Sequence, residues 1–271
     1  MRATPEQLAR RAFQKAKAVI VTTGAGMGVD SGLPDFRGPE GFWRAYPALR
    51  DLDLSFEEIA TPMWFERDPR LAWGFYGHRL NLYRQTRPHE GYTMLQEGIG
   101  SRPHFALTTN VDNALQKSGW PPLHVYEMHG RINTFQCTVC DRAPWDGSRI
   151  NVKVGANLRA IGKLPTCPDC GSVARPNIMM FNDPYFDPTV NEQQRSRYRT
   201  WLSRHRDDMQ GIVVVEIGAG KAIPTLRRMG AMLEEDGATL IRINLRESEG
   251  SSSTISLPMT GLRGISILTE P

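Results

Sequence analysis

The four cysteines of this 271-residue chain carry the most informative spacing for chemistry. Cys137 and Cys140 form one Cys-x-x-Cys pair, Cys167 and Cys170 form a second, and no cysteine is left over. Each pair lets two thiolates face one ion from a tight turn, and two such turns complete the four-sulfur shell of structural zinc sites. A redox dithiol or unliganded core cysteines are the alternatives. Because all four ligands would be protein sulfurs, we expect the zinc to be structural.

Two glycine-rich segments follow apolar runs and could cradle phosphate. They are Gly24-Ala25-Gly26 and Gly218-Ala219-Gly220. Backbone N–H groups at such turns bind phosphate, although a strand end also needs glycine simply to turn. Two such turns are what a crevice at the carboxyl edge of a doubly wound sheet would use. Residues 29–38 are rich in glycine and proline, so we expect a loop there instead of the helix of an ordinary dinucleotide fingerprint.

The elements that must position these motifs alternate between strands and helices. The pattern predicts strands at 18–23, 105–109, 211–217 and 239–244, and helices at 5–17, 68–84, 191–210 and 224–235. Apolar strands separated by helices indicate a parallel sheet covered on both faces. Residues 39–90 are predicted to form a helical module, and residues 131–176 a small metal-held module. The expected class is therefore α/β, with a Rossmann-like doubly wound sheet and a smaller inserted domain.

Composition and charge exclude several classes of protein. No apolar run approaches the ~18 residues that span a bilayer, and the N-terminus lacks the apolar stretch and cleavage site of a secretory signal. The formal charge of +4, without a basic cluster, is too small to indicate nucleic-acid binding. The two cysteine pairs favour a reduced compartment, so we expect a cytoplasmic protein that does not bind membranes.

The motifs resemble those of the sirtuin (Sir2-like) family, bacterial type, over about residues 15–245 and in the family's order. The residues that carry the resemblance are Gly24 to Gly26, Ser31 to Gly38, Thr108-Thr109-Asn110-Val111-Asp112, Met128-His129-Gly130, the two cysteine pairs and Arg175-Pro176. Taken alone, His129 would be an ordinary histidine, and Asn110 and Asp112 would be helix caps. Their combination overturns those readings.

The resemblance implies a domain organisation and a reaction. Residues 1–38, 91–130 and 177–271 would form a large Rossmann-like NAD-binding domain, with 39–90 and 131–176 forming the small domain. The chain would be an enzyme, an NAD-dependent protein-lysine deacylase, that transfers the acyl group to ADP-ribose. Its products would be nicotinamide, O-acyl-ADP-ribose and free lysine. NAD is then a cosubstrate, zinc is structural, and the partners are proteins that carry acylated lysine.

The resemblance also assigns roles to residues. His129 would be the general base, and Asn110 and Asp112 would hold nicotinamide and its ribose. The cofactor contacts would come from Gly24, Ala25, Gly26, Asp35, Phe36, Arg37, Thr109, Gly218, Ala219, Gly220 and Asn244. The substrate tunnel would be lined by Ile178, Met179, Met180 and Phe181. Substrate backbone would pair there as an added strand.

Four positions depart from the family's pattern. The family commonly has Ser at Gly28, Gln at Thr109, Gly-Thr-Ser at 218–220 and Phe-Gly-Glu at 181–183. The first three departures remove polar side chains from the cofactor shell. Each lost hydrogen bond could weaken binding by about 0.5–1.5 kcal/mol. The departures put the catalytic rate and the reaction outcome in question, but not NAD binding itself.

Tyr76 and Arg79 bear on which acyl group the enzyme would accept. The two residues share one face of an expected helix. Sirtuins that prefer succinyl- or malonyl-lysine carry a Tyr-x-x-Arg pair at the corresponding place, where arginine would bind the acyl carboxylate in a bidentate fork. The pair therefore favours desuccinylation or demalonylation. In the alternative, Tyr76 is a core residue and Arg79 a solvated surface residue.

Three other functions remain open from the sequence. A protein ADP-ribosyltransferase would use the same NAD cleavage, and the altered cofactor shell motivates it. A non-catalytic NAD or ADP-ribose sensor would need neither His129 nor the Asn110–Asp112 pair, so their presence argues against it. A zinc-ribbon nucleic-acid module is disfavoured by the weak net charge.

Overall fold

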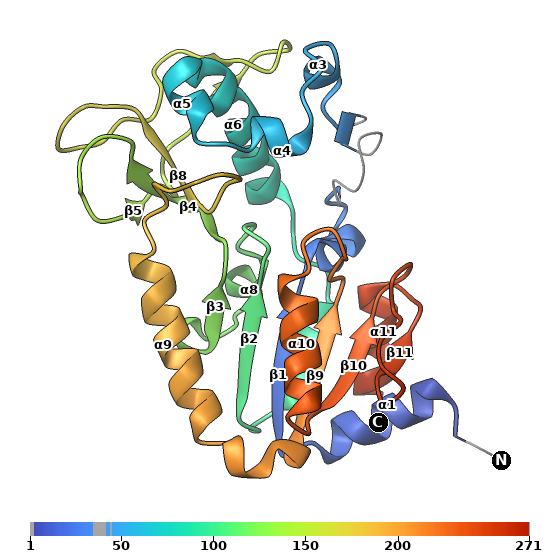
Figure 1. The fold of residues 1–271 in the computed structure, drawn as a ribbon. Coiled ribbons are helices and arrows are strands. Elements are labelled where there is room, and N and C mark those ends of the chain that lie inside the picture. The colour runs from blue at the N-terminus through green and yellow to red at the C-terminus, as the bar shows by residue number, and fades with distance from the viewer. Residues whose placement is uncertain (1–2, 35–41, 44, 271) are drawn as a thin grey trace.

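A six-stranded parallel sheet forms the larger part of the molecule, with strand order β11-β10-β9-β1-β2-β3 (Figure 1). The computed structural model describes residues 3–34, 42–43 and 45–270, so Asp35, Phe36 and Arg37 lie outside the described residues. The strands are β1 (Ala18–Thr23), β2 (His104–Thr108), β3 (Val125–Glu127), β9 (Ile212–Ile217), β10 (Thr239–Ile243) and β11 (Ile255–Leu257). This doubly wound order confirms the expected fold class and puts the topological switch point between β1 and β9.

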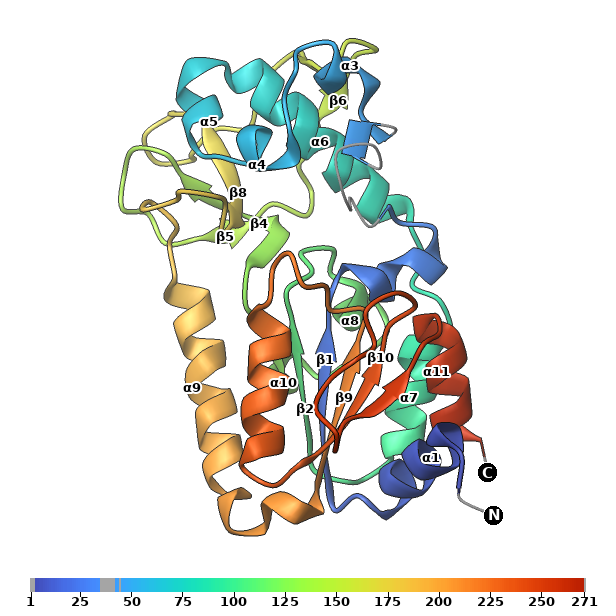
Figure 2. The same cartoon turned by 45° about the vertical axis from the view of Figure 1, so that its right-hand side comes forward.

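Helices cover both faces of this sheet (Figures 1 and 2). One face is covered by α1 (Pro5–Lys15), α7 (Gly91–Ile99), α8 (Ala114–Lys117) and α11 (Gly261–Thr269), and the other by α9 (Thr189–Ser203) and α10 (Thr225–Glu235). Strands β1 and β9 are consequently buried along their whole length, which explains why their sequences are nearly continuous apolar runs. Among the described residues, none of the helices combines the length and the apolar character needed to cross a bilayer.

Helix α1 begins where the sequence supplies a cap. Thr4 and Gln7 form a capping box, Pro5 occupies the first turn, and Phe13 is buried against the sheet. The helix ends at Lys15, two residues before the predicted end, because the chain must turn into β1. It packs on α11 (Figure 2).

A second body with its own core lies beyond the carboxyl edge of the sheet (Figure 2). It contains α3 (Pro47–Arg50), α4 (Phe56–Ile59), α5 (Met63–Arg67), α6 (Pro69–Gln85), the antiparallel sheet β5 (Trp145–Asp146), β4 (Gly130–Cys137) and β8 (Ala174–Ile178), and the pair β6 (Lys153–Val154) and β7 (Ala160–Ile161). The Trp73 ring on α6 lies 5.2 Å from that of Phe135, and its Nε1 donates to the Ala174 carbonyl at 2.7 Å. The helical and cysteine-bearing segments therefore share one core, which we call the small domain.

Two sequence expectations need correction. The predicted helix at 191–210 is split into α9 and a 3-10 helix, η3 (Arg206–Gly211), because the chain turns at Asp208 to enter β9. The predicted loop at 29–38 begins only at Gly32, because a 3-10 helix, η1 (Ala25–Ser31), follows β1 directly. A further short 3-10 helix, η2 (Pro122–His124), precedes β3.

Candidate active site and metal centre

The four cysteines converge at one end of the small domain. Their Sγ atoms all lie within 4.8 Å of one another, with Cys137 Sγ 3.5 Å from Cys170 Sγ and Cys140 Sγ 3.6 Å from Cys167 Sγ. Four thiolates at tetrahedral corners around zinc would be separated by about 3.8 Å. The donor set and its spacing therefore fit structural zinc, which would be held by Cys137, Cys140, Cys167 and Cys170.

The two glycine turns pack backbone on backbone at the switch point. Gly24 N donates to the Ile217 carbonyl at 2.9 Å, and Gly26 N donates to the Gly218 carbonyl at 3.0 Å. Gly218 has φ +65°, and a Cβ on Gly24 would lie 2.7 Å from the Gly218 oxygen. Only glycine permits this approach. The turns after β1 and β9 thus form one interlocked unit at the carboxyl edge of the sheet.

The loop after β2 is tied to this unit. Thr109 N donates to the Thr23 carbonyl at 3.2 Å, and Asn110 Nδ2 donates to the Gly24 carbonyl at 2.8 Å. Asp112 Oδ1 accepts from the Ala114 N–H at 2.9 Å. Burial raises the pKa of Asp112, while that hydrogen bond and nearby Lys117 oppose the rise. Asn110 is therefore fixed against the first glycine turn, and the Asp112 carboxylate is held by the backbone at Ala114.

A small pocket adjoins Asp112 at the junction with the small domain. It is lined by Ser31, Leu33, Tyr83, Thr86, Pro88, Tyr92, Asp112, Ala114 and Lys117. Gly28 lies beside it, since a Cβ on that residue would be 3.2 Å from Leu33 Cδ1 and 3.8 Å from Asp112 Oδ2. Gly28, one of the positions expected to depart from the family's pattern, therefore borders Asp112.

His129 follows β3, the strand next to β2 in the sheet. Its side chain is partly exposed but closely surrounded, and burial lowers its pKa while a hydrogen bond with the Thr109 backbone opposes that shift. Met128 N donates to the Thr108 carbonyl at 2.8 Å, which ties this segment to the end of β2. A histidine with a lowered pKa is neutral near pH 7 and can accept a proton there.

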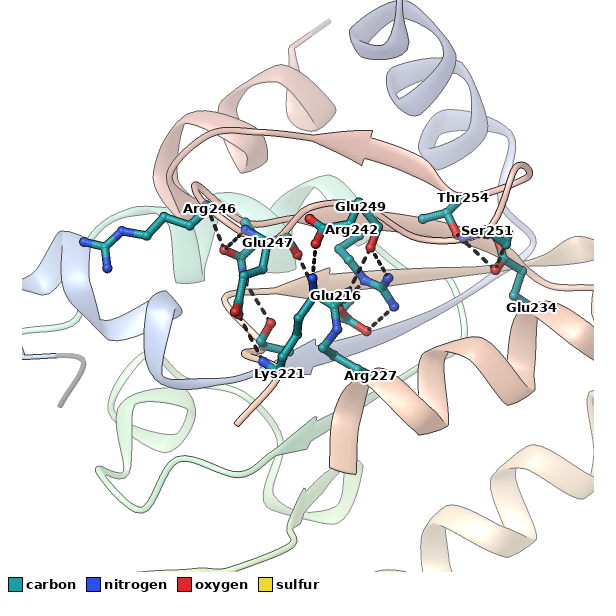
Figure 3. Close-up of polar contacts among 12 residues, drawn as sticks. Glu216, Lys221, Arg227, Glu234, Arg242, Arg246, Glu247, Glu249, Ser251 and Thr254 are labelled. Carbon is teal, nitrogen blue, oxygen red and sulfur yellow. Dashed lines mark hydrogen bonds and ion pairs between the residues drawn. The ribbon is translucent and has the colours of Figure 1, made fainter. Parts of the chain in front are cut away.

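Asn244 follows β10 at the same carboxyl edge of the sheet. Its Nδ2 donates to the Ala219 carbonyl at 2.8 Å, and its Oδ1 accepts from the backbone N–H groups of Arg246 and Glu247. The Asn244 side chain thus links the second glycine turn to the following loop, and Gly220 completes that turn. In Figure 3 the Arg246 side chain points away from the polar contacts of this loop.

A charged network beneath this loop holds it in place (Figure 3). Arg242 Nε pairs with Glu216 Oε1 at 2.6 Å across strands β10 and β9, and both side chains are buried. Arg242 and Arg227 also donate to the Glu249 carbonyl, each at 2.8 Å. Sequence reasoning did not identify Glu216 or Arg242, because a charged residue inside an apolar strand acquires meaning only from its cross-strand partner.

The expected substrate residues 178–181 lie at the end of β8 and just after it. Met179 N donates to the His129 carbonyl at 3.0 Å, Phe181 N donates to the Ala60 carbonyl at 2.9 Å, and Ile178 and Met180 are buried against the core of the small domain. The segment that follows β8 turns at Asn182, which has φ +51°, a conformation that asparagine tolerates.

Asp183, another position expected to depart from the family's pattern, anchors the segment that follows β8. It forms a buried ion pair with Arg175 and accepts from Met180 N at 3.2 Å. The buried carboxylate therefore braces the turn that carries Phe181.

Tyr76 and Arg79 are both buried on α6. The Tyr76 ring packs against Phe75, with 5.0 Å between ring centroids. Arg79 is not a solvated surface residue: its Nε and Nη2 donate to the Tyr83 hydroxyl at 3.1 and 2.7 Å. Tyr83 lines the pocket beside Asp112. The i, i+4 spacing of Arg79 and Tyr83 was the signal that could have identified Tyr83.

Comparisons with known proteins agree with this arrangement. A family model described as the Sir2 family matches residues 24–198. An NAD-dependent protein deacylase of Pyrococcus abyssi is 30% identical over 244 residues, covering 88% of this chain and 86% of that protein. An NAD-dependent protein deacylase of Leptospira interrogans is 30% identical over 256 residues, covering 94% and 91%.

Solved structures show the same fold. A Sir2 homologue in complex with NAD is similar with a TM-score of 0.73 and 24% identity, covering 97% of this chain and 92% of that one. A Sir2 variant with a deacetylated p53 peptide and 3′-O-acetyl ADP-ribose is similar with a TM-score of 0.67 and 17% identity, covering 98% and 97%. At these identities the likeness bears on the fold alone.

Proposed function

This chain belongs to the Sir2 family, and from that premise we infer that it is an NAD-dependent protein deacylase. One observation carries the inference: the interlocked glycine turns, the Asn110–Asp112 loop and a histidine with a lowered pKa, His129, meet at the carboxyl edge of one sheet. Ligands of doubly wound sheets bind at this edge, beside the switch point.

In the proposed reaction the acyl group moves from lysine to the ribose of ADP-ribose, with release of nicotinamide and uptake of one water. His129 accepts the proton of a ribose hydroxyl, for which a neutral imidazole is required. Asn110 and Asp112 hold the nicotinamide and its ribose, which is catalysis by positioning. The glycine turns and Asn244 bind the diphosphate and the adenosine ribose. The cofactor loop is completed by Asp35, Phe36 and Arg37, a role that rests on the resemblance of this segment to the family's motif.

We propose further that the acyl chain carries a carboxylate. The support is the Arg79 guanidinium, which is buried on α6 and held by the Tyr83 hydroxyl, next to the pocket that Asp112 lines. The Tyr83 hydroxyl fixes the orientation of the guanidinium, and a cation held in this way can bind a carboxylate through charge-assisted hydrogen bonds. Succinyl- and malonyl-lysine are therefore the proposed substrates, with the substrate backbone pairing along residues 178–181.

Three broader features belong to the same proposal. The large domain comprises residues 1–38, 91–130 and 177–271, and the small domain comprises 39–90 and 131–176. The enzyme works in the cytoplasm, where a reducing environment keeps four zinc-binding thiolates available. Its proposed partners are acylated proteins. Nucleic acid is not among them, in keeping with a net charge of only +4.

The decisive experiment measures nicotinamide release from NAD with acetyl-, succinyl- and malonyl-lysine peptides, with His129→Ala as the control. We expect release that requires both an acyl peptide and His129. Radiolabel transferred from NAD to protein without deacylation would instead support an ADP-ribosyltransferase. Binding of ADP-ribose without any turnover would support a sensor.

A further inference from the structure

We propose that Glu127, Arg131 and Gln194 are positioning residues for His129, acting where the chain crosses from the large sheet to the small domain. The inference rests on the proposed function, in which His129 is the general base. The three side chains do not touch the reacting atoms. They fix the short segment of backbone from which the imidazole projects.

The crossing is short and tightly folded. Strand β3 ends at Glu127 and β4 begins at Gly130, so His129 lies in a two-residue connection between two sheets. Gly130 has φ +75°, and a Cβ on it would lie 2.0 Å from the Asn177 oxygen on β8. A small rotation of this connection would therefore redirect the His129 side chain.

An ion pair spans this crossing. The Glu127 carboxylate is 3% exposed, and its Oε2 accepts from Arg131 Nε at 2.9 Å and from Arg131 Nη2. Glu127 belongs to β3, while Arg131 belongs to β4 on the other side of His129. The pair thus joins both ends of the five-residue stretch that has His129 at its centre.

Helix α9 holds the same carboxylate and its backbone. Gln194 Nε2 donates to Glu127 Oε2 at 3.0 Å, and Gln194 Oε1 accepts from Glu127 N at 2.8 Å. Asn191 Nδ2 donates to the Glu127 carbonyl. Both amide side chains are buried. These three hydrogen bonds to Glu127 all come from helix α9, which thereby sets the position of the crossing relative to the large sheet.

Stability alone gives a weak reason for this arrangement. A buried ion pair is often no more stabilising than apolar residues of the same size, because its desolvation offsets its attraction. What the pair does provide is a defined geometry, with charge-assisted hydrogen bonds in fixed directions. That geometry is built around the one residue whose orientation the reaction needs most.

The test uses Glu127→Gln, which keeps the shape and removes the charge, and two readouts. The first is the pKa of the His129 imidazole by NMR titration, assigned by comparison with His129→Ala. The charged groups around the segment are Glu127, Arg131 and, on the neighbouring loop, Asp112. Removing a negative charge would by itself lower the pKa. A looser crossing would admit water and raise the pKa toward ~6.5. We expect a rise, which the charge change cannot produce.

The second readout is the kinetics of acyl-dependent nicotinamide release. We expect kcat to fall by about tenfold or more with KM for NAD little changed, because misplacement affects the chemical step. Arg131→Met should lower kcat in the same way, and Arg131→Lys should recover part of the lost kcat. Lys17→Met is the matched control, because it removes an exposed ion pair with Asp208 at 2.7 Å at the opposite edge of the sheet.

The outcomes separate this inference from the proposed function. If the wild type releases no nicotinamide with any acyl peptide, the proposed function fails, and the His129 titration still reports on positioning. If the wild type is active but Glu127→Gln leaves both the His129 pKa and kcat unchanged, the positioning role is wrong. If Glu127→Gln does not fold, Gln194→Leu, which retains the ion pair, supplies the same two readouts.

Discussion

His129 is the side chain whose surroundings most directly determine how activity depends on pH. Burial lowers its pKa, so the neutral form persists below the ordinary histidine value of ~6.5. A general base acts in the neutral form, so kcat/KM should fall as pH falls through the lowered pKa. We expect the midpoint of this acid limb to lie below pH 6.5. The measurement is kcat/KM for NAD between pH 4.5 and 9, with folding monitored by circular dichroism; a midpoint at or above 6.5 would contradict the assignment.

Arg79 and Tyr83 determine a second outcome at the residue scale. If the fork of Arg79 binds an acyl carboxylate, Arg79→Met should lower kcat/KM for succinyl-lysine relative to acetyl-lysine by roughly tenfold to a hundredfold, since a hydrogen bond to a charged group contributes about 1.5–3 kcal/mol. Tyr83→Phe removes the hydroxyl that holds the guanidinium and should shift the ratio in the same direction by less.

Tyr76→Phe is the control for that comparison. The ring stays buried against Phe75, so its packing is preserved. An unchanged substrate ratio in Tyr76→Phe would assign the supporting hydroxyl to Tyr83. A collapse of the ratio in Tyr76→Phe alone would assign that hydroxyl to Tyr76 instead. An acetyl preference that Arg79→Met leaves unaltered would remove the support for a dicarboxylic acyl group.

At the scale of elements, the ends of β1 and β9 behave as one unit. Gly24→Ala would put a methyl group 2.7 Å from the Gly218 oxygen and 2.8 Å from Ala219 Cα, both backbone atoms that cannot swing aside. We expect a loss of about 1–3 kcal/mol in the free energy of unfolding, as for other overpacked sites, together with weaker NAD binding because the turn itself moves.

Urea unfolding and NAD titration measure these two effects. Gly155→Ala is the control, since the nearest atoms that a methyl would meet there include the side-chain ends of Asn157 and Ile161 at 3.1 Å, which can yield. A Gly24→Ala protein that unfolds at the wild-type urea concentration and binds NAD equally well would show that the two turns are not interlocked.

The elements differ in how far the sequence predicts them. Strands β1 and β9 could be predicted because burial on both faces leaves a nearly continuous apolar run that is followed by glycine. The two-residue strands β5, β6 and β7 could not, because a pair of residues carries no periodicity. Helix α9 was expected to continue past Ser203, since no proline or glycine marks its end; the turn into β9 is imposed by the tertiary structure.

The site shows the same contrast. The cysteine spacing and the glycine turns are local signals with one chemical meaning, so their positions could be predicted. Glu127, Gln194 and Tyr83 are ordinary polar residues whose partners lie on other elements or one helical turn away. Their roles depend on which strands and helices meet, and a sequence pattern does not contain that information.

At the scale of the whole molecule, two cores meet at the site. The small domain buries its own apolar cluster, while the large sheet has a separate cluster on each face. The metal centre lies in the small domain, where Cys137 ends β4. The same strand begins beside His129 and pairs with β8, so we expect disorder at the metal centre to reach the site along β4.

Zinc removal should therefore disorder the small domain before the large sheet. Metal binding to structural cysteine sites is coupled to folding, so a chelator removes folding free energy from the domain that holds the metal. We expect one zinc per chain and loss of acyl-dependent nicotinamide release on chelation. The fluorescence of Trp73 and Trp145 in the small domain should shift. Far-ultraviolet circular dichroism should retain most of its signal, because the large sheet keeps both of its clusters.

Added zinc should restore activity where magnesium does not, and a chelated protein with full activity and unchanged fluorescence would show that the four cysteines do not organise the site.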